Sequence, residues 1–106
     1  MRFIRLPSQI ALPNLLNENI KIDFGFIDGN HKFDNIFIDW FYIDLLLNNN
    51  GYVLFDDTWL ESTQKTISFI KNNREDYKEI AIPTTNMGMF QKIDGDKRTW
   101  SHFKPF

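Results

Sequence analysis

Ile22-Asp-Phe-Gly-Phe-Ile-Asp28 and Gly51-Tyr-Val-Leu-Phe-Asp-Asp57 are two short apolar segments that each end on aspartate. A short run that is apolar on both alternating faces and is followed by turn residues is typical of a buried parallel strand. Between them, from Phe33 to Leu47, apolar side chains recur every three or four residues, which predicts an amphipathic helix. The centre of the chain therefore predicts a strand, a helix and a second strand.

The flanking segments extend this order on both sides. Spacing and turn signals predict two further helices, over Ala11–Asn17 and from a cap at Asp57 or Thr58 to Lys71-Asn72-Asn73, and two further strands, over Tyr77–Ile82 and Met87–Ile93. The polar tract Asn48-Asn49-Asn50 is expected to be a loop that ends the central helix. The resulting fold class is α/β, with a mostly parallel sheet, helices on its faces and a C-terminal antiparallel hairpin.

Size and composition exclude several classes of protein. The chain has 106 residues, of which 42% are hydrophobic and 16% aromatic, so it can fold as one globular domain and is not a disordered or collagen-like chain. A formal charge of -2 argues against nucleic acid as a partner. No apolar run is long enough to span a membrane, and the absence of cysteine fits a reducing compartment, so we expect a cytoplasmic protein.

The aspartates at the two strand ends are the strongest chemical signal. In an open parallel sheet, ligands bind beyond the carboxyl ends of the strands, and neighbouring strands lie about 4.8 Å apart. Asp28, Asp56 and Asp57 are therefore expected to meet at one rim, where their mutual repulsion favours Mg²⁺ or a ligand with a positive centre. The alternative is structural: Asp57 caps the next helix and Asp28 forms a turn.

Two further residues lie near this rim in the sequence. His31 follows Asp28 by three positions, and it is a candidate general base or a hydrogen-bonding partner of the acids. A lone histidine between a strand and a helix is also common as a turn or capping residue. Trp59 either forms a wall for a substrate or cofactor or packs against the sheet.

The segments Phe26–His31 and Gly51–Trp59 resemble class I S-adenosylmethionine-dependent methyltransferases. The likeness is to the small-molecule O-methyltransferases of the catechol and caffeoyl-CoA type and to methyltransferase domain family 24. It implies a partial Rossmann-like fold in which Asp28 closes the fourth strand of the family, Asp56 and Asp57 close the fifth, and these three hold a divalent metal, with Mg²⁺ expected.

The resemblance also implies a site for the methyl donor. The run Pro7-Ser8-Gln9 followed by Leu12-Pro13 is similar to the segment whose serine and glutamine contact the adenine of S-adenosylmethionine, so Ser8 and Gln9 are candidate donor-binding residues. Asp28 is assigned to the donor site as well as to the metal. The acceptor would be a hydroxyl group of a small molecule, which leaves sugars, phenols and small acids open.

The sequence departs from the family pattern in two ways. Asn30 stands where some members have an acidic residue, and His31 lies near the position of a lysine base in the catechol type. In addition, the glycine-rich loop and the acid that binds the ribose are missing. Residues 1–106 are therefore interpreted as one partial domain, the C-terminal half of the fold, with the apolar edge of the first strand covered by a second copy or by the missing N-terminal half.

Two other functions remain open from the sequence. One is an inactive half-domain that acts only as an interaction or oligomerisation module through that edge. The other is a receiver-like phosphoacceptor module, which also gathers aspartates and Mg²⁺ at strand ends but requires a lysine that closes a later strand. The segment Tyr77–Ile82 is followed by Pro83-Thr84 instead.

Overall fold

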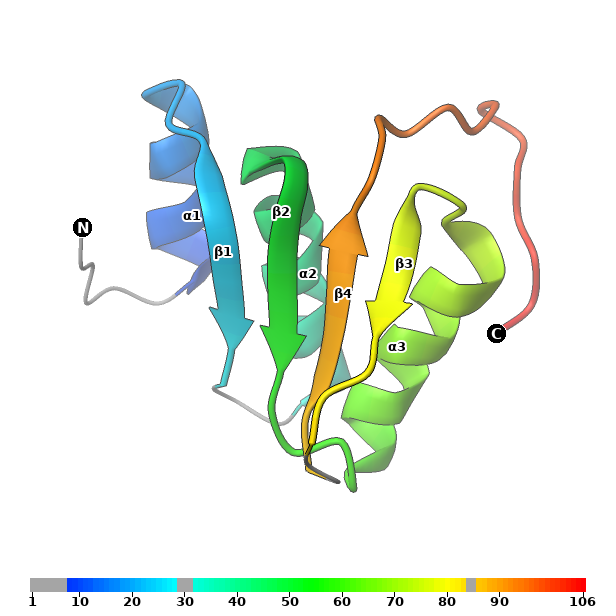
Figure 1. The fold of residues 1–106 in the computed structure, drawn as a ribbon. Helices are drawn as coiled ribbons and strands as arrows, with labels where there is room; N and C mark the ends of the chain where they lie inside the picture. Colours follow the sequence, from blue (N-terminus) through cyan, green and yellow to red (C-terminus); the bar gives the residue numbers. More distant parts are fainter. Residues whose placement is uncertain (1–7, 29–31, 84–85) are drawn as a thin grey trace.

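The computed structural model describes residues 8–28, 32–83 and 86–106, and its chain forms a four-stranded sheet and three helices (Figure 1). In chain order the elements are α1 (Ser8–Asn17), β1 (Ile22–Ile27), α2 (Phe33–Leu46), β2 (Leu47–Phe55), α3 (Glu61–Asn73), β3 (Tyr77–Ile80) and β4 (Gly88–Lys92). The predicted order and type of all seven elements are confirmed.

The sheet is mixed, and the prediction of a mostly parallel sheet is wrong. The strand order is β1-β2-β4-β3, in which β1 and β2 pair in parallel while β4 pairs antiparallel with both β2 and β3. The predicted C-terminal hairpin of β3 and β4 is present. The α3 crossover carries β3 one position away from β2, and the return strand β4 fills the gap, so that two of the three strand pairs become antiparallel.

The three helices lie on one face of the sheet (Figure 1), so the expectation of helices on both faces is also wrong. Helix α2 lies at the centre of this layer and contacts α1, α3, β1 and β2. Its inward side chains Trp40 and Ile43 join Val53, Phe55 and Phe90 of the sheet in one hydrophobic core. The opposite face of the sheet carries no helix among the described residues.

The polar tract after α2 belongs to a strand and not to the predicted loop. Helix α2 ends at Leu46, and β2 runs without interruption from Leu47 to Phe55. The extra residues are absorbed by a bulge, because Ile22 pairs with Leu47 while Phe24 pairs with Tyr52. Asn50 adopts the left-handed conformation within this bulge, with a φ of 71°. Local polarity predicted a loop, whereas the pairing of the flanking residues Leu47 and Tyr52 with β1 makes the tract a bulge within the strand.

The start of α3 also differs from the prediction. The helix begins at Glu61, and the residue before it is Leu60, which makes no side-chain capping hydrogen bond. Asp57 and Thr58 lie in a turn that precedes the helix, and the Leu60 N–H donates to the carbonyl oxygen of Asp57 at 3.0 Å. The structural alternative for Asp57, a helix cap, is therefore not what the structure shows.

A buried cluster of charges joins the helical layer to the far end of the sheet. Arg74, which follows α3 and is only 5% exposed, donates two hydrogen bonds to Asp44 of α2 and two to Asp76, at 2.7 to 3.0 Å. The Tyr77 hydroxyl donates to Asp44 Oδ1 at 2.7 Å, and Lys92 Nζ donates to the Asp44 carbonyl oxygen at 2.8 Å. The cluster thus fixes α2, α3, β3 and β4 relative to one another.

The pKa values in this cluster follow from its burial. Desolvation by itself would lower the pKa of Arg74, but its hydrogen bonds to Asp76 and Asp44 outweigh that effect and raise the pKa. Burial, together with the charge of Asp44, raises the pKa of the Tyr77 hydroxyl. Arg74 therefore stays charged and Tyr77 stays neutral and able to donate over the whole working range of pH.

Asp44→Asn is expected to lower the free energy of unfolding by about 3 kcal/mol, because it leaves a buried guanidinium with half of its anionic partners. Tyr77→Phe removes one donor and should cost about 1 kcal/mol. Urea denaturation followed by circular dichroism measures both changes. Asp34→Asn, on the exposed side of the same helix, is the control and should change stability by less than about 0.5 kcal/mol. Equal effects at Asp44 and Asp34 would contradict the structural role of the cluster.

Among the described residues, none of the helices has the length and apolar character that crossing a membrane requires.

Candidate functional site

The parallel pairing of β1 and β2 brings their carboxyl ends to the same edge of the sheet. Ile27 pairs with Phe55, and the ladder continues by one more bond, in which the Asp56 N–H donates to the Ile27 carbonyl oxygen at 3.1 Å. The residues that follow the last pair are Asp28 on one strand and Asp56 on the other. The predicted convergence of the two strand ends is therefore present in the structure.

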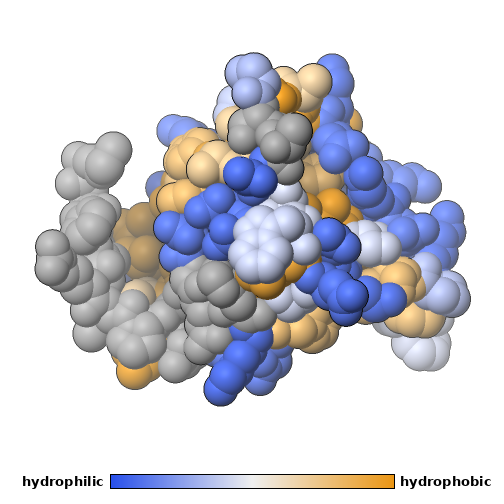
Figure 2. Space-filling model, turned by 90° about the horizontal axis from the view of Figure 1, so that it is seen from below, coloured by the Kyte–Doolittle hydropathy of each residue, from blue (hydrophilic) through white to orange (hydrophobic). Residues whose placement is uncertain are grey.

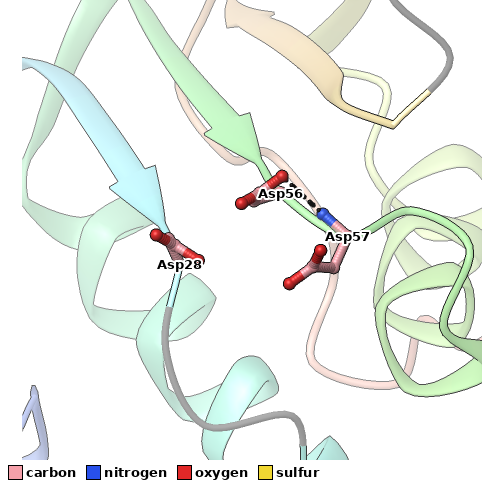
Figure 3. A group of neighbouring side chains, drawn as sticks. All are labelled: Asp28, Asp56 and Asp57. Carbon is pink, nitrogen blue, oxygen red and sulfur yellow. Dashed lines mark hydrogen bonds between the residues drawn. The ribbon is translucent and has the colours of Figure 1, made fainter.

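Asp57 joins these two acids through its backbone conformation. Its φ of 55° lies in the left-handed region, which is uncommon for a residue other than glycine. The chain turns there, and one carboxylate oxygen from each of Asp28, Asp56 and Asp57 lies within 4.8 Å of the others. Figure 3 shows the three side chains around a common space between the ends of β1 and β2. Asp28 is exposed, and Asp56 and Asp57 are half-buried.

Hydrogen bonds hold the turn that carries Asp57. The Asp57 N–H donates to Asp56 Oδ1 at 2.8 Å, drawn in Figure 3, and the indole Nε1 of Trp59 donates to Asp57 Oδ1 at 3.3 Å. The Thr58 N–H donates to the carbonyl oxygen of Asn86, and Gln64 Nε2 donates to the carbonyl oxygen of Thr58. The turn is therefore anchored to α3 and to the segment before β4, which limits its freedom to carry Asp57 away from the other two acids.

The donor set fits a hard divalent cation. Three carboxylates supply oxygen ligands, which Mg²⁺ and Ca²⁺ prefer, and their partial exposure leaves room for the water ligands that Mg²⁺ retains. Three negative charges at this separation repel one another, and a cation between them would turn the repulsion into attraction. Figure 2 views the molecule from the side of these strand ends and shows hydrophilic residues gathered near the middle of that face.

The other residues predicted for the site are not placed by the structure. His31 lies outside the described residues. Ser8 and Gln9 are the first two residues of α1, and their side chains also lie outside what is described. The roles of these three residues in base catalysis and in binding of the methyl donor stay predictions.

Sequence reasoning missed two parts of the site. The sequence leaves Trp59 as a wall or as packing, but it is exposed and its indole N–H holds a carboxylate of the site. The backbone carbonyl oxygen of Asn86, on the loop before β4, accepts a hydrogen bond from the Thr58 N–H. The spacing of two residues between Asp57 and Trp59 across a turn could have suggested the first contact. The second depends on the long-range position of β4.

Comparison with known protein families identifies the chain. The family model described as methyltransferase domain matches residues 1–58, more than half of the chain. The chain belongs to the methyltransferase domain family. No curated protein matches the chain. The matched part of this methyltransferase domain includes β1, β2 and the whole acidic trio, together with Ser8, Gln9 and His31.

The acidic trio of the methyltransferase domain should lower the stability of its metal-free form. Asp56→Asn keeps an oxygen that accepts the Asp57 N–H but removes one of the three charges, so it is expected to raise the free energy of unfolding by up to about 1 kcal/mol at low salt. Urea denaturation in the presence of a chelator measures the gain, which should shrink as salt screens the charges.

The matched control for this prediction is Asp34→Asn. Asp34 lies in the first turn of α2, where the helix dipole favours a negative charge, so its neutralisation should reduce stability slightly. A loss of stability in Asp56→Asn that is as large as in Asp34→Asn would show that the trio is not electrostatically strained.

Proposed function

We propose that this methyltransferase domain uses S-adenosylmethionine to methylate hydroxyl groups of small molecules with the help of a divalent metal. The observation that carries the proposal is the convergence of Asp28, Asp56 and Asp57 within 4.8 Å, inside the segment that matches the family. The same three positions are the ones that the family resemblance assigns to a metal.

The three aspartates would hold the metal from two adjacent strands and the turn after them. A divalent cation bound there would supply a Lewis acid that orients an acceptor hydroxyl and lowers its pKa. The contribution of the protein would be to position the acceptor and to keep Asp57 in place through its bonded neighbours Asp56 and Trp59. His31, three residues after Asp28 in the sequence, is the proposed base for the hydroxyl proton.

Binding of the methyl donor is the second part of the proposal. Ser8 and Gln9, at the start of α1, are proposed to contact the adenine, and Asp28 borders the donor as well as the metal. Of the described glycines, Gly25, Gly51 and Gly88 lie in strands and Gly95 follows β4, so none forms a phosphate-type glycine-rich turn between a strand and a helix. We therefore propose that further donor contacts come from a complementary half of the fold.

A partial donor site favours a second candidate function, the interaction module without catalysis. The exposed apolar side chains Phe24 and Phe26 on the edge strand β1 support it. The receiver-like alternative loses its basis for two reasons. The chain belongs to a methyltransferase family, and the lysine that a receiver requires at the end of a later strand is not found after β3, which ends at Ile80 and is followed by Ala81.

Mg²⁺ is expected to stabilise the protein against thermal unfolding. At a concentration ten times its Kd, a ligand that binds only the folded state adds about 1.4 kcal/mol, which corresponds to a rise in Tm of about 5 °C or more for a domain of this size. Differential scanning fluorimetry with MgCl2, compared with NaCl of the same ionic strength, measures the shift.

The shift should disappear in Asp56→Asn/Asp57→Asn and remain in Asp34→Asn, which removes a charge from a part of α2 outside the trio. A double variant that keeps the full Mg²⁺ shift would mean that the ion binds elsewhere, and the metal part of the proposal would fail.

Donor binding separates the enzyme from the interaction module. Isothermal titration calorimetry with S-adenosylhomocysteine, the demethylated donor, should show binding that weakens about tenfold or more in Ser8→Ala/Gln9→Ala, since each lost hydrogen bond costs about 1 kcal/mol. Absence of binding in the wild type, with Mg²⁺ binding intact, would favour the non-catalytic module.

A further inference from the structure

The C-terminal segment, residues 94–106, forms a strap along α3. It contains no helix or strand, and Figure 1 shows that it leaves the end of β4 and returns beside α3. Asn73, at the end of α3 and only 2% exposed, binds the main chain of the strap. The Asn73 side chain donates to the Lys104 carbonyl oxygen at 2.9 Å, and its amide oxygen accepts the Lys104 N–H at 2.7 Å. This pair of hydrogen bonds fixes the path of the strap at one end of the helix.

Two further residues of α3 extend this binding surface toward the start of the helix. Lys65, Phe69 and Asn73 are spaced by four residues, so they form one ridge of α3. The Phe106 ring packs edge-on against Phe69, with ring centroids 5.2 Å apart. Lys65 Nζ donates to the backbone oxygen of Phe106 and lies 5.1 Å from the centroid of its ring. The strap is therefore bound along three successive turns and reaches the first half of α3.

The same half of α3 holds the turn that carries Asp57. Leu60, the residue before the helix, makes no side-chain capping bond, and a helix start without a cap leaves backbone N–H groups unsatisfied. Gln64, which directly precedes Lys65, reaches back from this start, because its Nε2 donates to the Thr58 carbonyl oxygen at 2.9 Å. Gln64 thus ties the helix to the residue that follows Asp57.

This tie matters because the backbone of Asp57 is in an uncommon conformation. Its φ of 55° is unfavourable for a residue that has a side chain, so surrounding contacts must maintain the turn. Asn86 accepts the Thr58 N–H on one side of the turn, and Gln64 donates to the Thr58 carbonyl oxygen on the other. The Gln64 side chain is exposed, so it contributes this hydrogen bond without filling the core.

We propose that Gln64 is a positioning residue of the acidic trio and that the strap holds the part of α3 from which Gln64 acts. The contacts lead from Phe106 in the strap to Asp57 in the site by way of Gln64. The inference rests on the proposed metal site, and it concerns how tightly that site binds a divalent cation. An Asp57 carboxylate that is already held beside the other two acids needs less ordering when the ion binds, so the affinity is higher.

Gln64→Met tests the positioning role, because it keeps the length of the side chain and removes the donor. We expect Mg²⁺ to bind about fivefold more weakly, the factor that corresponds to one ordinary hydrogen bond. Titration with MgCl2 at constant ionic strength, followed by tryptophan fluorescence, measures the Kd, and Trp59 reports on the site since its indole N–H is bonded to Asp57. Asn72→Leu is the matched control. It removes a similar hydrogen bond, to the Ser68 carbonyl oxygen at 2.8 Å, near the far end of α3, and should leave the Kd unchanged.

A double variant tests the role of the strap. Phe106→Ala alone should weaken Mg²⁺ binding about threefold, because the strap loses its ring contact with Phe69. Gln64→Met/Phe106→Ala should bind no more weakly than Gln64→Met, since the strap acts through Gln64, whereas independent effects would multiply to about fifteenfold. Trp100→Ala is the control within the strap, because its side chain is 99% exposed, and it should have no effect.

The measured outcomes separate this inference from the metal site itself. Circular dichroism first confirms that each variant is folded at the temperature of the titration. An unchanged Kd in Gln64→Met would overturn the role of Gln64, and multiplied effects in the double variant would overturn that of the strap. In both cases the metal site would stand. If the unmodified chain binds no Mg²⁺, the proposed metal site and this inference both fail.

Discussion

The parallel pairing of β1 with β2 is the constraint on which the rest of the molecule depends. Two strands that run in the same direction must end at the same side of the sheet, so the residues after them come together without any further contact. The extra bond from the Asp56 N–H to the Ile27 carbonyl carries this alignment to the last residue before the acids. The positions of Asp28 and Asp56 are thus a consequence of backbone pairing, and the left-handed turn at Asp57 adds the third acid.

Helix α2 packs closely on the helical face of the sheet and supports the pairing of β1 with β2. A Cβ atom at position 25 would lie 2.7 Å from the Ile43 side chain. Because glycine has no Cβ, α2 can approach β1 at this point. The next residue of the same helix, Asp44, accepts hydrogen bonds from Arg74 and Tyr77 and forms an ion pair with Lys92. Helix α2 therefore connects the strands that carry the site to the antiparallel strands that complete the sheet.

Local patterns in the sequence were enough to predict the elements and the acidic rim, but not the arrangement of the sheet. The apolar spacing of α2 and the short runs of β1 and β2 each arise from which face is buried, and that information is local. The insertion of β4 between β2 and β3 depends on pairing between Val53 and Phe90, far apart in the chain, which no local pattern records.

The wrong loop prediction at Asn48-Asn49-Asn50 and the burial of Arg74, which no sequence pattern indicated, have the same origin. Asparagine favours turns, yet the tract stays within a strand because Leu47 and Tyr52 on either side pair with β1 and because Asn48 donates a hydrogen bond to Asp23 at 3.0 Å. An arginine after a helix is usually exposed, and Arg74 is buried only because Asp44 and Asp76, from two separate segments, meet it. Tertiary partners decided both positions.

The acidic trio is more exposed on one strand than on the other. Asp28 is exposed, while Asp56 and Asp57 are half-buried. The two half-buried carboxylates also accept hydrogen bonds, Asp56 from the Asp57 N–H and Asp57 from the indole of Trp59, so the turn holds them near each other. Charges interact more strongly where water is partly excluded, so the repulsion between Asp56 and Asp57 is the part of the trio that a bound cation would relieve most.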